Sequence, residues 1–136
     1  MVTVTMMTTQ QETMTSTALI VKPEWIERLL DPANPKTWEI RGSDTKKRGE
    51  IYFIPSKSSD MVGRATLVRS IPLTRELFES NMDKHQTESW DAVAGRYKRP
   101  HAWIFADNTR ISPIPVERKC GAVVWAKVQA RTGDTH

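Results

Sequence analysis

The feature that most constrains the fold is the shortness of the apolar segments. None approaches the ~20 residues that a membrane-spanning helix needs, and several are bounded by prolines or charged turns. Short segments that are wholly apolar, or that alternate between apolar and polar residues, are typical of strands. The predicted strands are residues 18–22, 36–41, 50–55, 61–71, 101–106 and 121–128.

Two or three helices are predicted between these strands. Pro23 suits the first position of a helix, where its missing N–H is not needed, and residues 23–31 carry an apolar stripe with helical spacing. Thr74 is suited to cap a second helix over residues 75–85, and a short helix is expected near residues 89–93. There are too few crossovers for a doubly wound sheet, so a mixed α/β, β-rich fold is favoured: a small β-barrel with two or three flanking helices.

The 136 residues are enough for one ordinary domain. We expect that residues 18–128 form it, that the threonine- and methionine-rich residues 1–17 are a flexible leader, and that residues 129–136 are a frayed tail. The single Cys120 excludes an intramolecular disulfide framework and a thiol-rich zinc site. With no secretory signal pattern, the expected location is cytoplasmic.

Three charged residues lie close together in the second predicted strand: Lys36, Glu39 and Arg41. Strict alternation would put Glu39 and Arg41 on one face and Lys36 on the other, whereas a turn or bulge at Lys36 would bring all three to one rim. Such a trio offers a cation for a phosphate or carbonyl oxygen, an acceptor for the exocyclic amine of a base, and a forked guanidinium. The alternative is a solvated strand edge with an Arg–Glu pair worth under ~1 kcal/mol.

A second basic cluster surrounds Tyr97, namely Arg96, Lys98 and Arg99. Cations around an aromatic ring suit a phosphate backbone and a stacked base, and the formal net charge of +4 permits a polyanionic partner. The alternative reading places Tyr97 in the core and leaves the cations merely exposed.

The five tryptophans are many for a chain of this length. Trp38 neighbours the charged trio and is predicted to stack on a base. Trp25 lies on the helical stripe and Trp103 lies in an apolar strand, so both are predicted to belong to the core.

The order of the segments resembles a known family. The segments are KPEWIERLL, KTWEIRG, KRGEIYFIPS, VGRATLV, DKH, YKRPHAWIF and KCGAVVWAKV. They are similar to the ASCH (activating signal cointegrator homology) domain family over residues 18–128. The hallmark of that family is a lysine two residues before a hydrophobic-Glu-hydrophobic-Arg pattern, matched here by Lys36 and residues 38–41. The family's small-residue turn before the lysine is replaced by residues 31–35.

The resemblance implies a PUA-like β-barrel with a cleft that holds RNA or nucleotides. In that case Lys36, Glu39 and Arg41 would form the floor of the cleft, and Ser56 would line it. The function predicted from the sequence is therefore binding of RNA or of a modified nucleoside in a basic cleft.

Two enzymatic alternatives follow from the same resemblance. Some ASCH proteins hydrolyse the amide of N4-acetylcytidine, with a lysine, a threonine three residues later and a more distant glutamate. Lys36 keeps the first role, Glu88 approximates the last, and Glu39 occupies the threonine position, so an amidohydrolase here would use Lys36, Glu39 and Glu88.

Other ASCH proteins are associated with cleavage of single-stranded RNA. Metal-independent cleavage needs an acid and a base such as His85 or His101, although His85 is more readily read as a cap or surface histidine. The spacing of Asp83, His85 and Glu88 would scatter these side chains around a helix, so no metal site is predicted.

The remaining expectations are absences. There is no Gly-rich dinucleotide or P-loop motif, no HExxH and no GxSxG, so dehydrogenase, kinase, zinc protease and α/β-hydrolase activities have no support. No cofactor, no membrane and no obligatory protein partner are expected. A protein-interaction module that uses the leader as a flexible arm is a third function class.

Overall fold

The computed structural model describes residues 16–117 and 125–130. Most of the predicted leader and the end of the predicted tail lie outside the described residues, as does the first half of the strand expected over 121–128. The first strand starts at Ser16, two residues before the predicted start of the domain. In the described part of the chain, no helix is long and apolar enough to cross a membrane.

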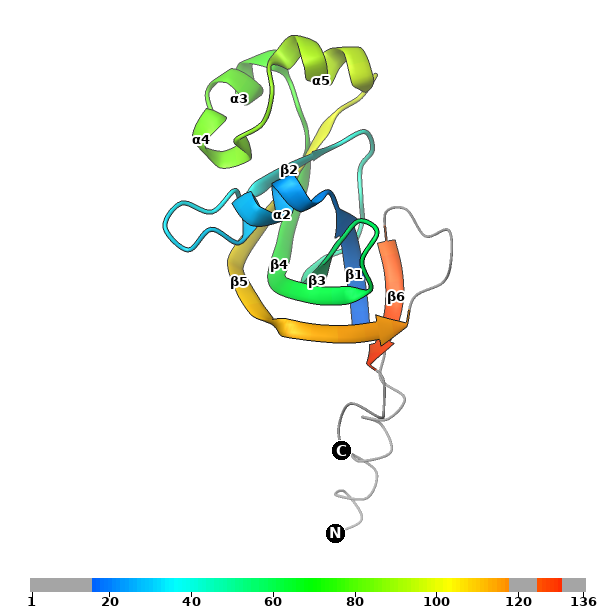
Figure 1. The fold of residues 1–136 in the computed structure, drawn as a ribbon. Coiled ribbons are helices and arrows are strands. Elements are labelled where there is room, and N and C mark those ends of the chain that lie inside the picture. The colour runs from blue at the N-terminus through cyan, green and yellow to red at the C-terminus, as the bar shows by residue number, and fades with distance from the viewer. Residues whose placement is uncertain (1–15, 118–124, 131–136) are drawn as a thin grey trace.

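The strands form one six-stranded mixed sheet in the order β2-β5-β4-β3-β1-β6 (Figure 1). Their bounds are β1 Ser16–Val21, β2 Trp38–Arg41, β3 Gly49–Pro55, β4 Asp60–Pro72, β5 His101–Glu117 and β6 Trp125–Ala130. The β1–β3 pair is parallel and the other recorded pairs are antiparallel. Each predicted strand that lies in the described residues is present, and the mixed α/β class is confirmed.

Two long strands, β4 and β5, bend the sheet (Figure 1). Three register shifts interrupt their pairing. Asp107 in β5 has a positive φ of 58°, a backbone conformation that residues other than glycine adopt at a cost. The prediction that this strand ends near residue 106 is wrong. The turn-forming residues that follow form a bulge, after which the strand continues to Glu117.

The curved sheet is not closed into a barrel. Among the described residues, β5 meets β6 through two residue pairs only, Val116 with Ala130 and Glu117 with Gln129. Two pairs at the strand ends do not make a continuous seam, so the predicted small β-barrel is corrected to an open, strongly bent sheet.

The described residues contain four helices: α2 Pro23–Leu29, α3 Arg75–Glu79, α4 Met82–His85 and α5 Trp90–Arg96. Pro23 opens α2, and the Thr74 hydroxyl accepts the Leu77 N–H at 3.1 Å to cap α3, as predicted. The single helix predicted over residues 75–85 is two helices instead. At the break the Ser80 hydroxyl and the Asn81 amide donate to carbonyls of the preceding turn, which ends α3.

Helices α3, α4 and α5 gather at one end of the sheet, whereas α2 lies against its concave side (Figure 1). Each group covers an apolar cluster. In the first cluster Ile26 of α2 packs with Leu19 of β1 and Phe53 of β3. The second cluster includes Phe78 of α3 and Val93 of α5.

Candidate functional site

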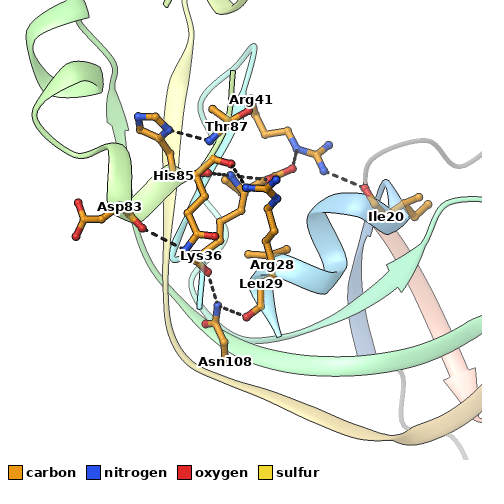
Figure 2. Close-up of polar contacts among 11 residues, drawn as sticks. Ile20, Arg28, Leu29, Lys36, Arg41, Asp83, His85, Thr87 and Asn108 are labelled. Atoms are coloured by element: carbon orange, nitrogen blue, oxygen red, sulfur yellow. Dashed lines mark hydrogen bonds and ion pairs between the residues drawn. The ribbon is translucent and has the colours of Figure 1, made fainter. Parts of the chain in front are cut away.

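The backbone around Lys36 is fastened to three elements. Lys36 N–H donates to the Arg28 carbonyl of α2 at 2.8 Å, and Thr37 N–H donates to the Lys84 carbonyl of α4 at 2.9 Å. The side-chain amide of Asn108, in the β5 bulge, donates to the Lys36 carbonyl at 2.8 Å and to the Leu29 carbonyl at 3.1 Å (Figure 2). These bonds hold the lysine in a fixed position before β2 begins.

The Lys36 side chain is buried, with 1% of the residue exposed. Its Nζ donates to the His85 carbonyl and lies 3.7 Å from Glu39 Oε1. Burial lowers the pKa of Lys36 from 10.5 to about 8; the Glu39 carboxylate opposes this effect, while Arg28 and Arg41 add to it. The amine is therefore mainly protonated at neutral pH and loses its proton in mildly alkaline solution.

Glu39 joins the two cations. Arg41 Nε donates to Glu39 Oε2 at 3.1 Å. Arg41 Nη2 donates to the Ile20 carbonyl of β1 at 2.9 Å, as Figure 2 shows. Because Lys36 precedes β2, strand alternation does not turn it away from Glu39 and Arg41. The turn at Lys36, one of the two arrangements open from the sequence, is the one found, and we call these three residues the charged cluster.

The charged cluster lines a pocket with a volume of about 300 Å³, which we call the Lys36 pocket. Its wall combines residues of the sheet, of α2 and of α5, so it lies between the two helical groups. The lining residues are Ile20, Lys22, Trp25, Lys36, Glu39, Ile40, Arg41, Ser56, Thr87, Val93, Arg96 and Tyr97. Ser56 takes the place expected for it; its N–H donates to the Val21 carbonyl at 2.8 Å.

Trp25 and Trp38 have the opposite positions to those predicted. Trp38 is 8% exposed and packs with Leu73 and Phe78, so it belongs to the core and does not line the Lys36 pocket. Trp25, predicted as core, is half-buried and lines the pocket, with Lys36 Nζ 5.2 Å from its ring centroid. Trp103 is buried as predicted. Helical spacing identified the apolar stripe that carries Trp25, but it could not show which segments of the chain pack against that stripe.

The second basic cluster, residues 96–99, is only partly in the pocket wall. Arg96 and Tyr97 line the Lys36 pocket, while Lys98 and Arg99 are exposed and lie outside its lining. A Cβ added at Gly42 would lie 2.5 Å from the Tyr97 ring, so the ring lies close against the backbone at Gly42. Only glycine leaves this space, a requirement that the sequence alone did not reveal.

Glu88 lies beside the pocket rather than in its lining. Its carboxylate accepts from Arg96 Nη2 at 2.7 Å, and this hydrogen bond raises the pKa of Arg96. Both side chains are largely exposed.

His85 is fully buried, so its interpretation as a surface histidine is wrong. Its Nδ1 accepts the Thr87 N–H at 3.2 Å, so the other ring nitrogen, 2.7 Å from the Phe78 carbonyl, carries the proton. Its ring also stacks on Phe78 with centroids 3.9 Å apart, and burial lowers its pKa. His85 is thus a neutral residue that holds the Thr87 segment, with no nitrogen left for a substrate.

His101 is half-exposed at the start of β5, where its Nδ1 lies 2.9 Å from the Arg99 carbonyl, and it does not line the pocket. Among the described residues, no group of three or more His, Cys, Asp or Glu side chains is placed to hold a metal ion.

No protein-family model matches the sequence, and no curated protein matches it. Solved structures do match the fold. An ASCH protein from Zymomonas mobilis is 15% identical, with a TM-score of 0.58 over 77% of this chain and 74% of that one. Two variants of a Zymomonas mobilis ASCH protein are both 16% identical and cover 74% of this chain. One, a tyrosine-to-phenylalanine variant, has a TM-score of 0.59 over 75% of its own chain. The other, a serine-to-alanine variant, has a TM-score of 0.60 over 73% of its chain.

The chain has an ASCH-type fold. At this level of identity the likeness extends to the fold and not to individual site residues. Within the ASCH-type fold of this chain, the hallmark lysine, glutamate and arginine meet at one pocket, and that geometry is independent of the comparison.

Proposed function

We propose that the Lys36 pocket binds RNA or a modified nucleoside. The observation that carries the proposal is the make-up of its wall: four cations, one carboxylate and two half-buried aromatic rings around about 300 Å³. Small-molecule pockets begin at about this volume, so the space suits one nucleoside rather than a folded RNA element.

Each part of the wall has a counterpart in a nucleotide. The rings of Trp25 and Tyr97 suit the faces of a base, and stacking of this kind contributes roughly 1–3 kcal/mol per base. Arg41 and Lys36 donate hydrogen bonds of the kind that carbonyl or phosphate oxygens accept, and Glu39 accepts those of an exocyclic amine. The ASCH-type fold supports the same proposal, because the sequence resemblance implies an RNA- or nucleotide-binding cleft.

The test is binding of fluorescein-labelled single-stranded RNA and of ribonucleosides to the wild-type chain and to two variants of equal net charge. Lys36→Gln removes a cation from the pocket, whereas Lys46→Gln removes an exposed one from the loop before β3. We expect the first variant to lose at least tenfold in affinity and the second to lose little. RNA affinity should also fall steeply with salt. Equal binding by both variants, or absence of binding by the wild type, contradicts the proposal.

One observation favours the amidohydrolase alternative as a second candidate. Lys36, with its pKa lowered to about 8, lies against a carboxylate in a small pocket, which suits stabilisation of a carbonyl oxygen or transfer of a proton. Glu88 stands outside the lining and is paired with Arg96, so Lys36 and Glu39 would carry the reaction. Ultraviolet absorbance of N4-acetylcytidine, followed with wild type and Lys36→Gln, decides whether turnover occurs and depends on the lysine.

The ribonuclease alternative has less support. Both ring nitrogens of His85 are occupied, and His101 is not part of the pocket lining.

A further inference from the structure

The inner end of the Lys36 pocket carries one positive charge more than its carboxylate neutralises. Lys36 and Arg41 share Glu39, whose two oxygens each face one of them. All three groups are largely removed from water, with exposed side-chain fractions of 1% for Lys36, 16% for Arg41 and 6% for Glu39. Buried charges are normally balanced by partners, because an uncompensated charge removed from water is strongly destabilising.

No other described residue supplies the missing negative charge. The charged and titratable groups that face Lys36 are Glu39 and Arg41 of β2, Arg28 of α2 and His85 of α4. Of these only Glu39 is acidic. The excess is therefore a property of the site, and a bound anion would remove it.

Donor hydrogens remain for such an anion. The Arg41 guanidinium has five N–H groups, of which one donates to Glu39 and one to the Ile20 carbonyl. The Lys36 ammonium has three, one of which donates to the His85 carbonyl. Two further cations, Lys22 and Arg96, are exposed and line the pocket, and Arg96 also donates to Glu88.

The size of the charge excess selects the kind of anion. Four cations and one carboxylate line the pocket, and the Glu88 carboxylate beside it is paired with Arg96, so the excess is two at neutral pH. A terminal phosphate carries about −1.5 to −2, whereas a phosphate inside a nucleic-acid chain carries one charge. An internal phosphate also has a ribose on each side, whereas a pocket of about 300 Å³ suits a single nucleotide.

We infer that the ligand of the Lys36 pocket bears a terminal phosphate, which binds at the inner end between Lys36 and Arg41 while the base lies against Trp25 and Tyr97. This inference rests on the proposed function and specifies its ligand. A free nucleoside monophosphate and a phosphorylated RNA end share this chemistry.

The test uses isothermal titration calorimetry of the full chain at pH 8.5, where a phosphate monoester is already fully ionised. The probes are the four ribonucleosides, their 5′-monophosphates, and one oligoribonucleotide with either a 5′-phosphate or a 5′-hydroxyl. Titration in two buffers of different ionisation enthalpy gives the number of protons taken up. An anion next to Lys36 raises its pKa from about 8, so binding should take up about 0.7 proton at this pH.

We expect a monophosphate to bind at least tenfold more tightly than its nucleoside and to take up this proton. Lys36→Gln should abolish the uptake and the tenfold preference, whereas Lys46→Gln should keep both. Preference for the mononucleotide or for the phosphorylated RNA end supports the inference and identifies the source. Equal affinity for nucleoside and monophosphate, or binding without proton uptake, overturns it while leaving nucleoside binding intact. Failure of every probe to bind overturns the proposed function itself.

Discussion

Replacing the buried Lys36 by methionine should change the pH dependence of folding stability in one direction. Methionine is of similar length and carries no charge, so it fills the same space. Burial lowers the pKa of Lys36 from 10.5 to about 8. At about 1.4 kcal/mol per pKa unit, the protonated lysine costs the folded state about 3 kcal/mol at neutral pH.

The direction in which the free energy of unfolding changes with pH follows from proton binding. Between pH 8 and 10.5 the unfolded chain holds the Lys36 proton and the folded chain does not, so the free energy of unfolding rises with pH in this window. The stability of wild type relative to Lys36→Met should increase by about 2 to 3 kcal/mol from pH 7 to pH 10. At pH 7 the two should be nearly equal, because the variant escapes the cost of the charge but leaves the His85 carbonyl without its donor, a loss of about 1–3 kcal/mol.

Urea unfolding followed by circular dichroism at pH 7, 8, 9 and 10 gives the two free energies. Groups that titrate alike in both proteins cancel in the difference, and the exposed Lys46→Met serves as the control that should show no such trend. A difference between wild type and Lys36→Met that stays constant from pH 7 to pH 10 would refute the assignment of Lys36 as a buried cation with a lowered pKa.

Three further outcomes are expected. Gly42→Ala should displace the Tyr97 ring, which lies 2.5 Å from the added Cβ, and weaken nucleoside binding several-fold with little change in RNA salt dependence; unchanged nucleoside affinity in a calorimetric titration counts against a stacking role. Glu88→Gln should remove the negative charge that neutralises Arg96 and raise the affinity for anionic ligands a few-fold, and a fall measured by fluorescence anisotropy contradicts this. Asn108→Leu removes two donated hydrogen bonds and should lower both ligand affinity and thermal stability, the latter by about 1–3 kcal/mol; loss of stability alone would mean that the amide does not position Lys36.

Local features of the sequence were sufficient to place many elements. Pro23 opens α2 and Thr74 caps α3 because both act through their own backbone or side chain within one helical turn. The strand that carries Trp38, Glu39 and Arg41 follows in the same way from its alternation. The order of the segments carried the resemblance to ASCH domains, and the ASCH-type fold agrees with it.

Long-range contacts decided what local features left open. The β5 strand continues through its bulge because β4 supplies a pairing partner as far as Asp60, which outweighs the turn signals after Ala106. The bent sheet stops short of a closed barrel for the same kind of reason, since closure depends on where β5 and β6 end and not on the composition of either strand.

The candidate site shows the same division. The sequence by itself determined that Lys36, Glu39 and Arg41 are near neighbours and that Trp25 lies on an apolar helical stripe, while it predicted Trp38 to stack on a base. Only the tertiary structure decided that α3 and α5 cover Trp38 while Trp25 faces a pocket, and that bonds from α2, α4 and β5 bury the lysine amine beside its two partners. A pattern specifies which side chains share a face, but burial and its effect on the pKa depend on what other segments bring to that face.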